Sequence, residues 1–292
     1  LILLILALGS AGIRHLMNVR FTQPMWLGDV PVAGKTILIH PEQGFGDMLQ
    51  FCRYAPLLEA MGARVIVETK APLLALMRSL SPTLTLVKQG DPLPPFDLHC
   101  PVMSLPHAFR TTLDTIPATV PYLTPSPEKI AQWRERLGTK TRPRIGLVWS
   151  GSLTSPVNVP RSVPFAELAP LLALPFEFHS LQKDFRPEER AAIEATPQLI
   201  RHGETVTSFE DTAAIISELD LVISTCTSLA HLTGALGKPL WMMLHDRADF
   251  RWLLARNDSP WYPTARLFRQ TKRDDWSNVI GSVIEAIETL HS

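Results

Sequence analysis

A glycine-containing segment that joins an apolar run to a helix-like run constrains this chain more than any other feature. The apolar run, residues 36–39, has the composition of a buried strand. The segment HPEQGFGDMLQFCRY follows at 40–54 and leads into apolar positions at helical spacing over 48–61. Glycines at a strand-to-helix junction let the backbone turn and approach a ligand closely, and the amides that begin a helix attract anions. The segment predicts a ligand-binding α/β protein with Asp47 at the mouth of the helix.

The composition excludes several classes of protein. Of the 292 residues 46% are apolar and 19% are charged, which is enough for two domains with sizeable cores. Lys and Arg together number 28, as do Asp and Glu, so no strong positive field exists to attract nucleic acid or acidic lipid. Three scattered cysteines fit a reducing compartment better than a disulfide scaffold. We therefore expect a cytoplasmic protein without a nucleic-acid partner.

The first residues form an apolar stretch that is too short to cross a membrane. LILLILALG has about eight apolar residues and no basic segment before it, whereas a membrane span needs roughly 20. We interpret residues 1–33 as the end of an upstream helical region followed by a linker. A clipped signal peptide is the alternative interpretation.

Strand-like and helix-like segments alternate along the rest of the chain. We expect strands at 36–40, 64–68, 84–88, 98–102, 144–149, 177–181, 199–201, 219–224 and 239–244. We expect helices at 48–61, 72–80, 127–137, 164–174, 187–195, 209–218, 228–236 and 276–290. Such alternation indicates parallel sheets with helices on both faces.

The alternating pattern restarts once, after a proline-rich stretch and a short helix. Residues 139–143 are polar and form a candidate hinge. We therefore predict one Rossmann-like domain over 34–140, a second over 141–274 and a closing helix over 275–292. Two such domains place a cleft between the carboxyl ends of their sheets.

A second loop, residues 224–231, has the chemistry of a phosphate-binding site. It has the sequence STCTSLAH and lies between a predicted strand and a predicted helix. Hydroxyl side chains and free amides at the start of a helix suit a diphosphate, and His231 lies about one turn into that helix. The alternative is that Thr227 or Ser228 only caps the helix and that His231 is a packing residue.

The motifs of the two loops, taken in order with five others, resemble a known group of proteins. The seven strings are EQGFGDMLQFCRYAPLL, RIGLVWSG, RSVPFAEL, SLQK, EDTAAIISELDLVIS, CTSLAHLTGALGKPLW and SPWYPTARLFRQ. From about residue 26 to residue 290 the chain resembles the glycosyltransferase-like domain found downstream of tetratricopeptide repeats in bacterial proteins. That domain is related to the heptosyltransferases of glycosyltransferase family 9.

The resemblance implies a fold and an activity. The fold is GT-B, in which two Rossmann-like parallel-sheet domains face a cleft. The activity is inverting, metal-independent transfer of a sugar from a nucleotide-diphosphate sugar to a hydroxyl acceptor, with no cofactor beyond that co-substrate. The implied partners are the donor, an acceptor glycan, lipid or protein, and possible upstream tetratricopeptide repeats.

The resemblance also implies roles for individual residues. Asp47 corresponds to the proposed base of the family, which deprotonates the acceptor hydroxyl; Glu42 is the reserve candidate, and helix capping is the other interpretation of Asp47. Arg161 suits a phosphate because its guanidinium can form two parallel hydrogen bonds. The predicted donor-binding residues are Gly44, Gly46, Ser150, Arg161, Gln182, Lys183, Thr227, Ser228 and His231.

One position departs from the heptosyltransferase pattern. Cys226 stands where an Asp is typical, which leaves the donor and the catalytic competence open. A nucleophilic Cys226 at a helix start is a weaker possibility, because no base is placed near it. A non-catalytic GT-B-like binding or scaffolding module is therefore the rival hypothesis, and a nucleotide-sugar epimerase on the same fold is a third.

Several other signals favour structural roles. Ser208 and Asp211 have the spacing of a capping box. His99 beside Cys100 lacks a second ligand pair for a metal. Trp252 and Trp261 are expected to attach a loop to the core.

Overall fold

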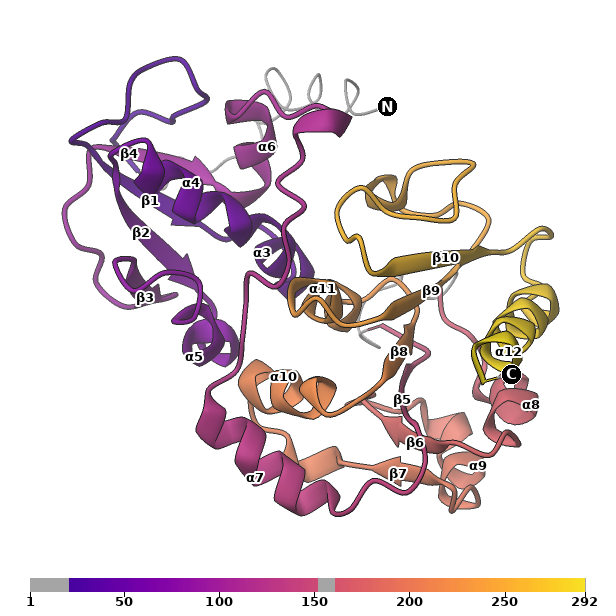
Figure 1. Ribbon diagram of the computed structural model, residues 1–292. Coiled ribbons are helices and arrows are strands. Elements are labelled where there is room, and N and C mark those ends of the chain that lie inside the picture. Colours follow the sequence, from indigo (N-terminus) through magenta and orange to yellow (C-terminus); the bar gives the residue numbers. More distant parts are fainter. Residues whose placement is uncertain (1–20, 152–160, 292) are drawn as a thin grey trace.

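The computed structural model describes residues 21–151 and 161–291, which form two parallel β-sheets with helices packed around them (Figure 1). The first sheet has the order β3-β2-β1-β4. Its strands are β1 (Thr36–His40), β2 (Arg64–Thr69), β3 (Thr85–Lys88) and β4 (Leu98–Pro101). All of their pairings are parallel. The predicted α/β class and the predicted first four strands are confirmed.

The second sheet has six parallel strands in the order β10-β9-β8-β5-β6-β7. They are β5 (Arg144–Val148), β6 (Glu177–Ser180), β7 (Leu199–Arg201), β8 (Leu221–Ser224), β9 (Leu240–Leu244) and β10 (Ala265–Arg269). The edge strand β10 was not predicted. Its sequence, ARLFR, mixes charged and apolar residues and lies beyond an irregular loop, so no apolar run marks it.

The helices are short and several are preceded by a 3₁₀ turn. They are α3 (Phe45–Phe51), α4 (Ala55–Ala60), α5 (Leu74–Met77), α6 (Leu105–Ala108), α7 (Pro127–Leu137), α8 (Ala169–Leu172), α9 (Arg190–Glu194), α10 (Phe209–Ser217), α11 (Ser228–Ala235) and α12 (Ser277–His291). The single helix predicted over 48–61 is wrong. A 3₁₀ turn at Cys52–Tyr54 separates α3 from α4, because Pro56 has no amide hydrogen to continue the α-helical ladder.

Both faces of the second sheet are covered, as predicted. Along β8, Leu221 and Ile223 belong to a core cluster that includes residues of α8 and α12, while Val222 belongs to a cluster that includes residues of α10 and α11. This alternation follows from the period of two in a strand. The first sheet differs on one face, where Leu38 packs with Phe21 and Phe96 from irregular segments.

The chain crosses from the first sheet to the second before α7. The backbone amides of Tyr122 and Leu123 both donate to the carbonyl oxygen of Ala235 on α11, at 3.0 and 3.3 Å. Helix α7, which we expected to close the first domain, lies along α10 of the second (Figure 1). The C-terminal helix α12 packs against α8, β9 and β10. Of the region 1–33, residues 1–20 lie outside the described residues, and Trp26 is buried in the first domain.

One hydrophobic cluster passes through both domains. It contains Ile37 and Leu49 from the first domain and Leu232 and Trp252 from the second. Helices α3 and α11 pack directly on each other at this junction (Figure 1). The two sheets are therefore joined by a packed apolar contact as well as by the connecting chain.

A buried arginine ties the same interface together. The Arg53 guanidinium donates to the carbonyl oxygens of Pro117 (3.0 Å) and Trp261 (2.8 Å) and to the Tyr122 hydroxyl (2.7 Å). Its Nε donates to the Gln50 carbonyl oxygen at 2.8 Å. One side chain thus supplies hydrogen bonds to the first domain, the crossing segment and the second domain.

Among the described residues, the helices are all too short or too polar to pass through a bilayer.

Replacing Arg53 by Leu should lower the free energy of unfolding by about 3 kcal/mol, because buried carbonyl oxygens lose charged donors. Urea denaturation followed by circular dichroism measures this. The control is Arg64→Leu, which removes an exposed arginine whose Nε donates to Thr36 Oγ1. Equal losses in the two variants would contradict a structural role for Arg53.

Candidate active site

A cavity of about 780 Å³ lies between the two domains. The ten predicted site residues all line it: Gly44, Gly46, Asp47, Ser150, Arg161, Gln182, Lys183, Thr227, Ser228 and His231. They converge because each group follows the carboxyl end of a parallel strand, namely β1, β5, β6 or β8. The roles assigned to these residues stay predictions, but their shared location is a property of the structure.

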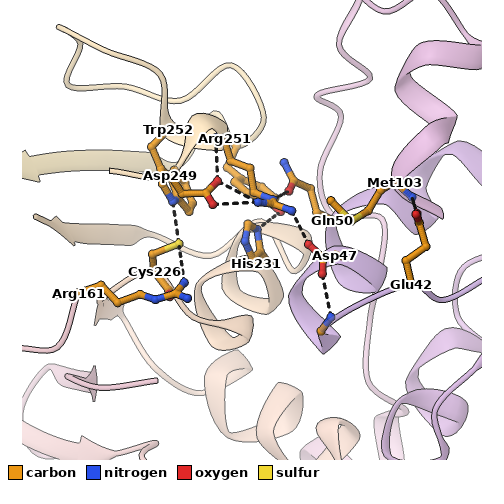
Figure 2. A network of polar contacts seen from close by, with 12 residues as sticks. Glu42, Asp47, Gln50, Met103, Arg161, Cys226, His231, Asp249, Arg251 and Trp252 are labelled. Carbon is orange, nitrogen blue, oxygen red and sulfur yellow. Dashed lines mark hydrogen bonds and ion pairs between the residues drawn. The ribbon is translucent and has the colours of Figure 1, made fainter. Parts of the chain in front are cut away.

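Asp47 lies on the third residue of α3, with 9% of its surface exposed. Its Oδ2 accepts a hydrogen bond from the Gly44 amide at 2.9 Å, and its Oδ1 accepts one from Nη2 of Arg251 (Figure 2). Asp47 therefore caps its own helix and also faces the cavity. The two interpretations of Asp47 are compatible in this geometry.

Arg251 reaches Asp47 from the other domain. Its Nη1 donates to both carboxylate oxygens of Asp249, at 2.9 and 3.1 Å, and its Nε donates to Gln50 Oε1 at 2.8 Å (Figure 2). Burial alone would lower the pKa of Arg251, but the carboxylates of Asp249 and Asp47 raise it above its ordinary value. The guanidinium thus stays charged and joins α3 to the loop after β9.

Sequence reasoning missed Arg251 and Asp249. The available signal was their position, because they follow the carboxyl end of the predicted strand 239–244 and line the cavity as the other strand-end residues do. The neighbouring Trp252 drew attention as a packing residue, and it is fully buried. It lies behind the cavity wall, where its Nε1 donates to Sγ of the lining residue Cys226 at 3.1 Å.

His231 is a buried neutral donor or acceptor, with 4% of its surface exposed. Its Nδ1 lies 2.9 Å from the Tyr262 hydroxyl oxygen, and its ring stacks on Trp252 with centroids 5.5 Å apart. Burial, reinforced by Arg251, Arg53 and Arg161, holds the pKa of His231 well below its ordinary value. His231 is a packing residue and a cavity residue at once, and at neutral pH it carries no charge.

Arg161 and Ser150 present polar atoms that no described residue satisfies. Arg161 Nη1 donates to the Cys226 carbonyl oxygen at 3.2 Å and lies 3.8 Å from its Sγ. Within residues 21–151 and 161–291, Arg161 Nε and Ser150 Oγ are buried and have no hydrogen-bond partner. Buried polar groups are usually paired, and these two atoms are available to a polar ligand in the cavity.

The remaining donor-side residues shape the cavity wall. Gln182 accepts a hydrogen bond from the Ser150 amide at 3.1 Å and so fixes the loop after β5. Lys183 is exposed at the cavity edge. Thr227 is the N-cap residue of α11, and its side chain makes no capping hydrogen bond to the described part of the chain. The first amides of α11, from Ser228 onward, therefore face the cavity without a side-chain acceptor.

The hypothesis of a nucleophilic Cys226 has no support in the geometry. Burial, followed by the Asp249 carboxylate, raises the pKa of the Cys226 thiol, so the thiol stays protonated. A protonated thiol is a poor nucleophile.

Glu42 is not part of the cavity wall. Its carboxylate accepts from the Met103 amide at 2.8 Å, on the side of α3 away from Arg251 (Figure 2). The position of Asp47 at the cavity wall therefore favours it over Glu42 as the candidate base, and both assignments stay predictions.

The capping prediction for Asp211 is confirmed. Its Oδ2 accepts from the Ser208 amide at 3.1 Å, and its Oδ1 accepts from Lys129 and Trp133 of α7.

His99 pairs with His40, Nδ1 to Nε2, at 3.1 Å. Within the described ranges, no three His, Cys, Asp or Glu side chains gather as a metal-binding group.

Sequence comparison with known proteins gives a partial match. No protein-family model matches the chain. Protein FlbA of Caulobacter vibrioides is 27% identical over a 293-residue alignment, which covers 90% of this chain and 48% of FlbA. The chain therefore spans about half the length of that relative.

Comparison with solved structures shows the fold of the chain. A glycosyl transferase family 9 protein from Veillonella parvula superposes with a TM-score of 0.64 at 13% identity, over 91% of this chain and 100% of that one. The E. coli ADP-heptose LPS heptosyltransferase II gives 0.61 at 14% identity, over 87% and 98%. The chain has the GT-B fold. E. coli heptosyltransferase WaaC with ADP gives 0.54 at 12% identity, over 87% and 99%.

Replacing Arg251 by Met should lower the free energy of unfolding by about 3–5 kcal/mol, because Asp47 and Asp249 would keep partly buried charges without their partner. The matched control is Arg256→Met. Arg256 also pairs with a nearby carboxylate, Asp258, but that carboxylate is largely exposed, so its loss should cost about 1 kcal/mol or less. Urea denaturation of both variants measures the two free energies of unfolding. Comparably small losses in the two variants would contradict the buried ion-pair network.

His202, at the cavity wall, should make stability depend on pH. Its Nε2 lies 3.0 Å from His179 Nδ1, and burial, then His179 and Arg136, lowers its pKa to about 4. Below the ordinary histidine pKa of about 6.5, the unfolded chain binds a proton at this residue that the folded chain does not bind. The free energy of unfolding therefore decreases as the pH is lowered. Between pH 7.5 and 5.0, His202→Gln should lose about 2 kcal/mol less than the parent protein. Parallel urea titrations at the two pH values measure this difference, and equal losses would contradict it.

Proposed function

We propose that this chain is a glycosyltransferase that moves a sugar from a nucleotide-diphosphate sugar to a hydroxyl acceptor with inversion. The observation that carries the proposal is the single cavity shared by the two domains. On one wall it has the carboxylate of Asp47, and on the other it has the start of α11 and the guanidinium of Arg161. A base and an anion site that face one cavity are the two parts such a transfer needs.

The donor would bind on the second-domain side. The amides at the start of α11, the hydroxyls of Thr227 and Ser228, and the buried Nε of Arg161 would hold the diphosphate. These groups would also stabilise the negative charge that develops on the diphosphate as its bond to the sugar breaks. The unsatisfied Ser150 Oγ would add a hydrogen bond to the same ligand.

The acceptor would bind on the Asp47 side. As the acceptor oxygen forms its bond to the anomeric carbon, its proton would pass to Asp47, and the bond from that carbon to the diphosphate would break on the opposite face. Oδ1 of Asp47 is held by Arg251 and Oδ2 by Gly44, so the acceptor hydroxyl would use a remaining lone pair. The fixed carboxylate would need no reorganisation for the attack.

The donor class is also a proposal. Among proteins of similar fold, WaaC is described with ADP, and TibC of E. coli is described as an iron-containing heptosyltransferase in complex with ADP-D-β-D-heptose. An ADP-sugar is therefore the first donor to test. We propose that Arg161 and α11, without a metal ion, neutralise the diphosphate; assays with and without a chelator test this part separately.

A non-catalytic binding or scaffolding module is the rival proposal. Two observations favour it: both oxygens of Asp47 already accept hydrogen bonds, and Cys226 stands where heptosyltransferases typically have a carboxylate. A cytoplasmic location and an association with upstream tetratricopeptide repeats also stay proposals. Three buried cysteines that form no disulfide with one another are compatible with a reducing compartment.

Isothermal calorimetry and thermal shift with ADP, UDP, GDP and their sugars test the donor site. A nucleotide at 100 times its dissociation constant should raise stability by about 2.7 kcal/mol, and His231→Ala should weaken its binding. His107→Ala is the control, because His107 lies on α6 and does not line the cavity. Asp47→Asn should bind the same nucleotide but release none of it from the nucleotide-sugar when acceptors are added. No binding by any nucleotide would contradict the donor site, and binding without turnover in the unmodified protein would favour the rival.

A further inference from the structure

A chain of buried hydroxyl groups leads from Arg53 at the domain interface to His231 at the cavity wall. Arg53 Nη2 donates to the Tyr122 hydroxyl oxygen at 2.7 Å, and Tyr122 donates its own hydrogen to the Leu49 carbonyl oxygen at 2.8 Å. A carbonyl oxygen can only accept, so the Tyr122 hydrogen is committed to Leu49. Tyr262 is fully buried and lies between the Tyr122 hydroxyl and His231.

The Tyr262 hydroxyl is protonated and has two possible hydrogen-bond acceptors. Burial, offset in part by Arg53, raises the pKa of Tyr262 to about 12, so the phenol is neutral. Its hydrogen can go to the Tyr122 oxygen or to Nδ1 of His231. The Tyr122 oxygen already accepts from a guanidinium, whereas the imidazole lone pair is more basic and lies 2.9 Å away. The Arg53 guanidinium, 4.9 Å from the centre of the Tyr262 ring, also polarises the phenol as a donor.

We propose that Tyr262 donates to Nδ1 of His231 and so holds the imidazole in the tautomer that carries its hydrogen on Nε2. Tyr262 is then a positioning residue, and His231 presents one N–H donor to the cavity. In a neutral histidine the bond made by one ring nitrogen decides which nitrogen carries the proton. The anionic ligand of this donor is a phosphate group of the nucleotide, a step that rests on the proposed function.

The surroundings of both rings fix this arrangement. Gly234 lies one turn after His231, and a Cβ there would be 2.3 Å from the Tyr262 ring, so only glycine lets the phenol reach Nδ1. On the other edge of the imidazole, a Cβ on Gly46 would be 2.9 Å from Cδ2 and 3.6 Å from Nε2. The Nε2 edge thus faces the glycine-rich loop of the first domain, and both His231 and this loop line the cavity.

The tautomer can be measured without any substrate. Long-range ¹⁵N–¹H correlation spectra of histidine-labelled protein at pH 7.5 distinguish the nitrogen that carries hydrogen, and the spectrum of His231→Ala assigns the signal of His231. We expect the Nε2–H tautomer in the unmodified protein and its loss, or a mixture of tautomers, in Tyr262→Phe. An Nδ1–H tautomer in the unmodified protein overturns the proposal whether or not any variant folds.

A binding experiment tests the positioning role with ADP as the probe. Tyr262→Phe should weaken ADP binding about tenfold, because the N–H donor to a charged phosphate is no longer fixed. The matched control is Tyr54→Phe, which removes a buried hydroxyl 2.8 Å from Thr111 Oγ1 away from the cavity and should leave ADP affinity unchanged. Equal ADP affinity in Tyr262→Phe and the unmodified protein overturns the positioning role. If the unmodified protein binds no ADP, the proposed donor fails, while the tautomer measurement still decides between the two states of His231.

Discussion

The close packing of α3 against α11 is the contact on which the rest of the site depends. Gly46 makes it possible, since any side chain at this position would collide with the His231 ring. The glycine does not adopt a left-handed backbone here; its lack of a side chain lets two helices from different domains approach. The sequence suggested that the glycines bring the backbone close to a ligand. The structure adds that Gly46 also sets the distance between Asp47 and the donor-side helix.

The distribution of charge around this contact explains the unusual cysteine. Asp47 and Asp249 both pair with Arg251, and no ion pair is found for Arg161 among the described residues. A carboxylate at position 226 would lie against Arg161, whose Nη1 is 3.8 Å from Cys226 Sγ, and would pair with it. The thiol instead leaves the guanidinium available to an anionic ligand. The departure from the heptosyltransferase pattern thus changes the charge of the site without removing the groups that we propose to bind an anion.

Local patterns predicted ten residues of the cavity wall, but they could not predict the long-range contacts between its two sides. Each of the ten predicted residues follows a strand that its own apolar run reveals, and parallel strands bring such ends to one edge. The Asp47–Arg251 pair joins residues 204 positions apart, so it exists only once the two domains dock. The contact of Tyr262 could not be predicted for the same reason, because its partner, His231, lies on a different element, α11. The break between α3 and α4 has a local cause in Pro56, whereas β10 has too mixed a composition to be recognised as a strand.

The buried ion-pair network helps to decide between an enzyme and a scaffold. Placing Asp47, Asp249 and Arg251 in a poorly solvated interface has a desolvation cost, and well-packed apolar residues would join two domains at least as firmly. A scaffold gains nothing from such a carboxylate at a cavity wall. The proposed enzyme would use it, because Arg251 fixes the orientation of the Asp47 carboxylate at the cavity wall. Since Gln50 and Gly44 complete the hydrogen bonding of this network, the carboxylate of Asp47 is held in one orientation, which is what the proposed transfer requires of its base.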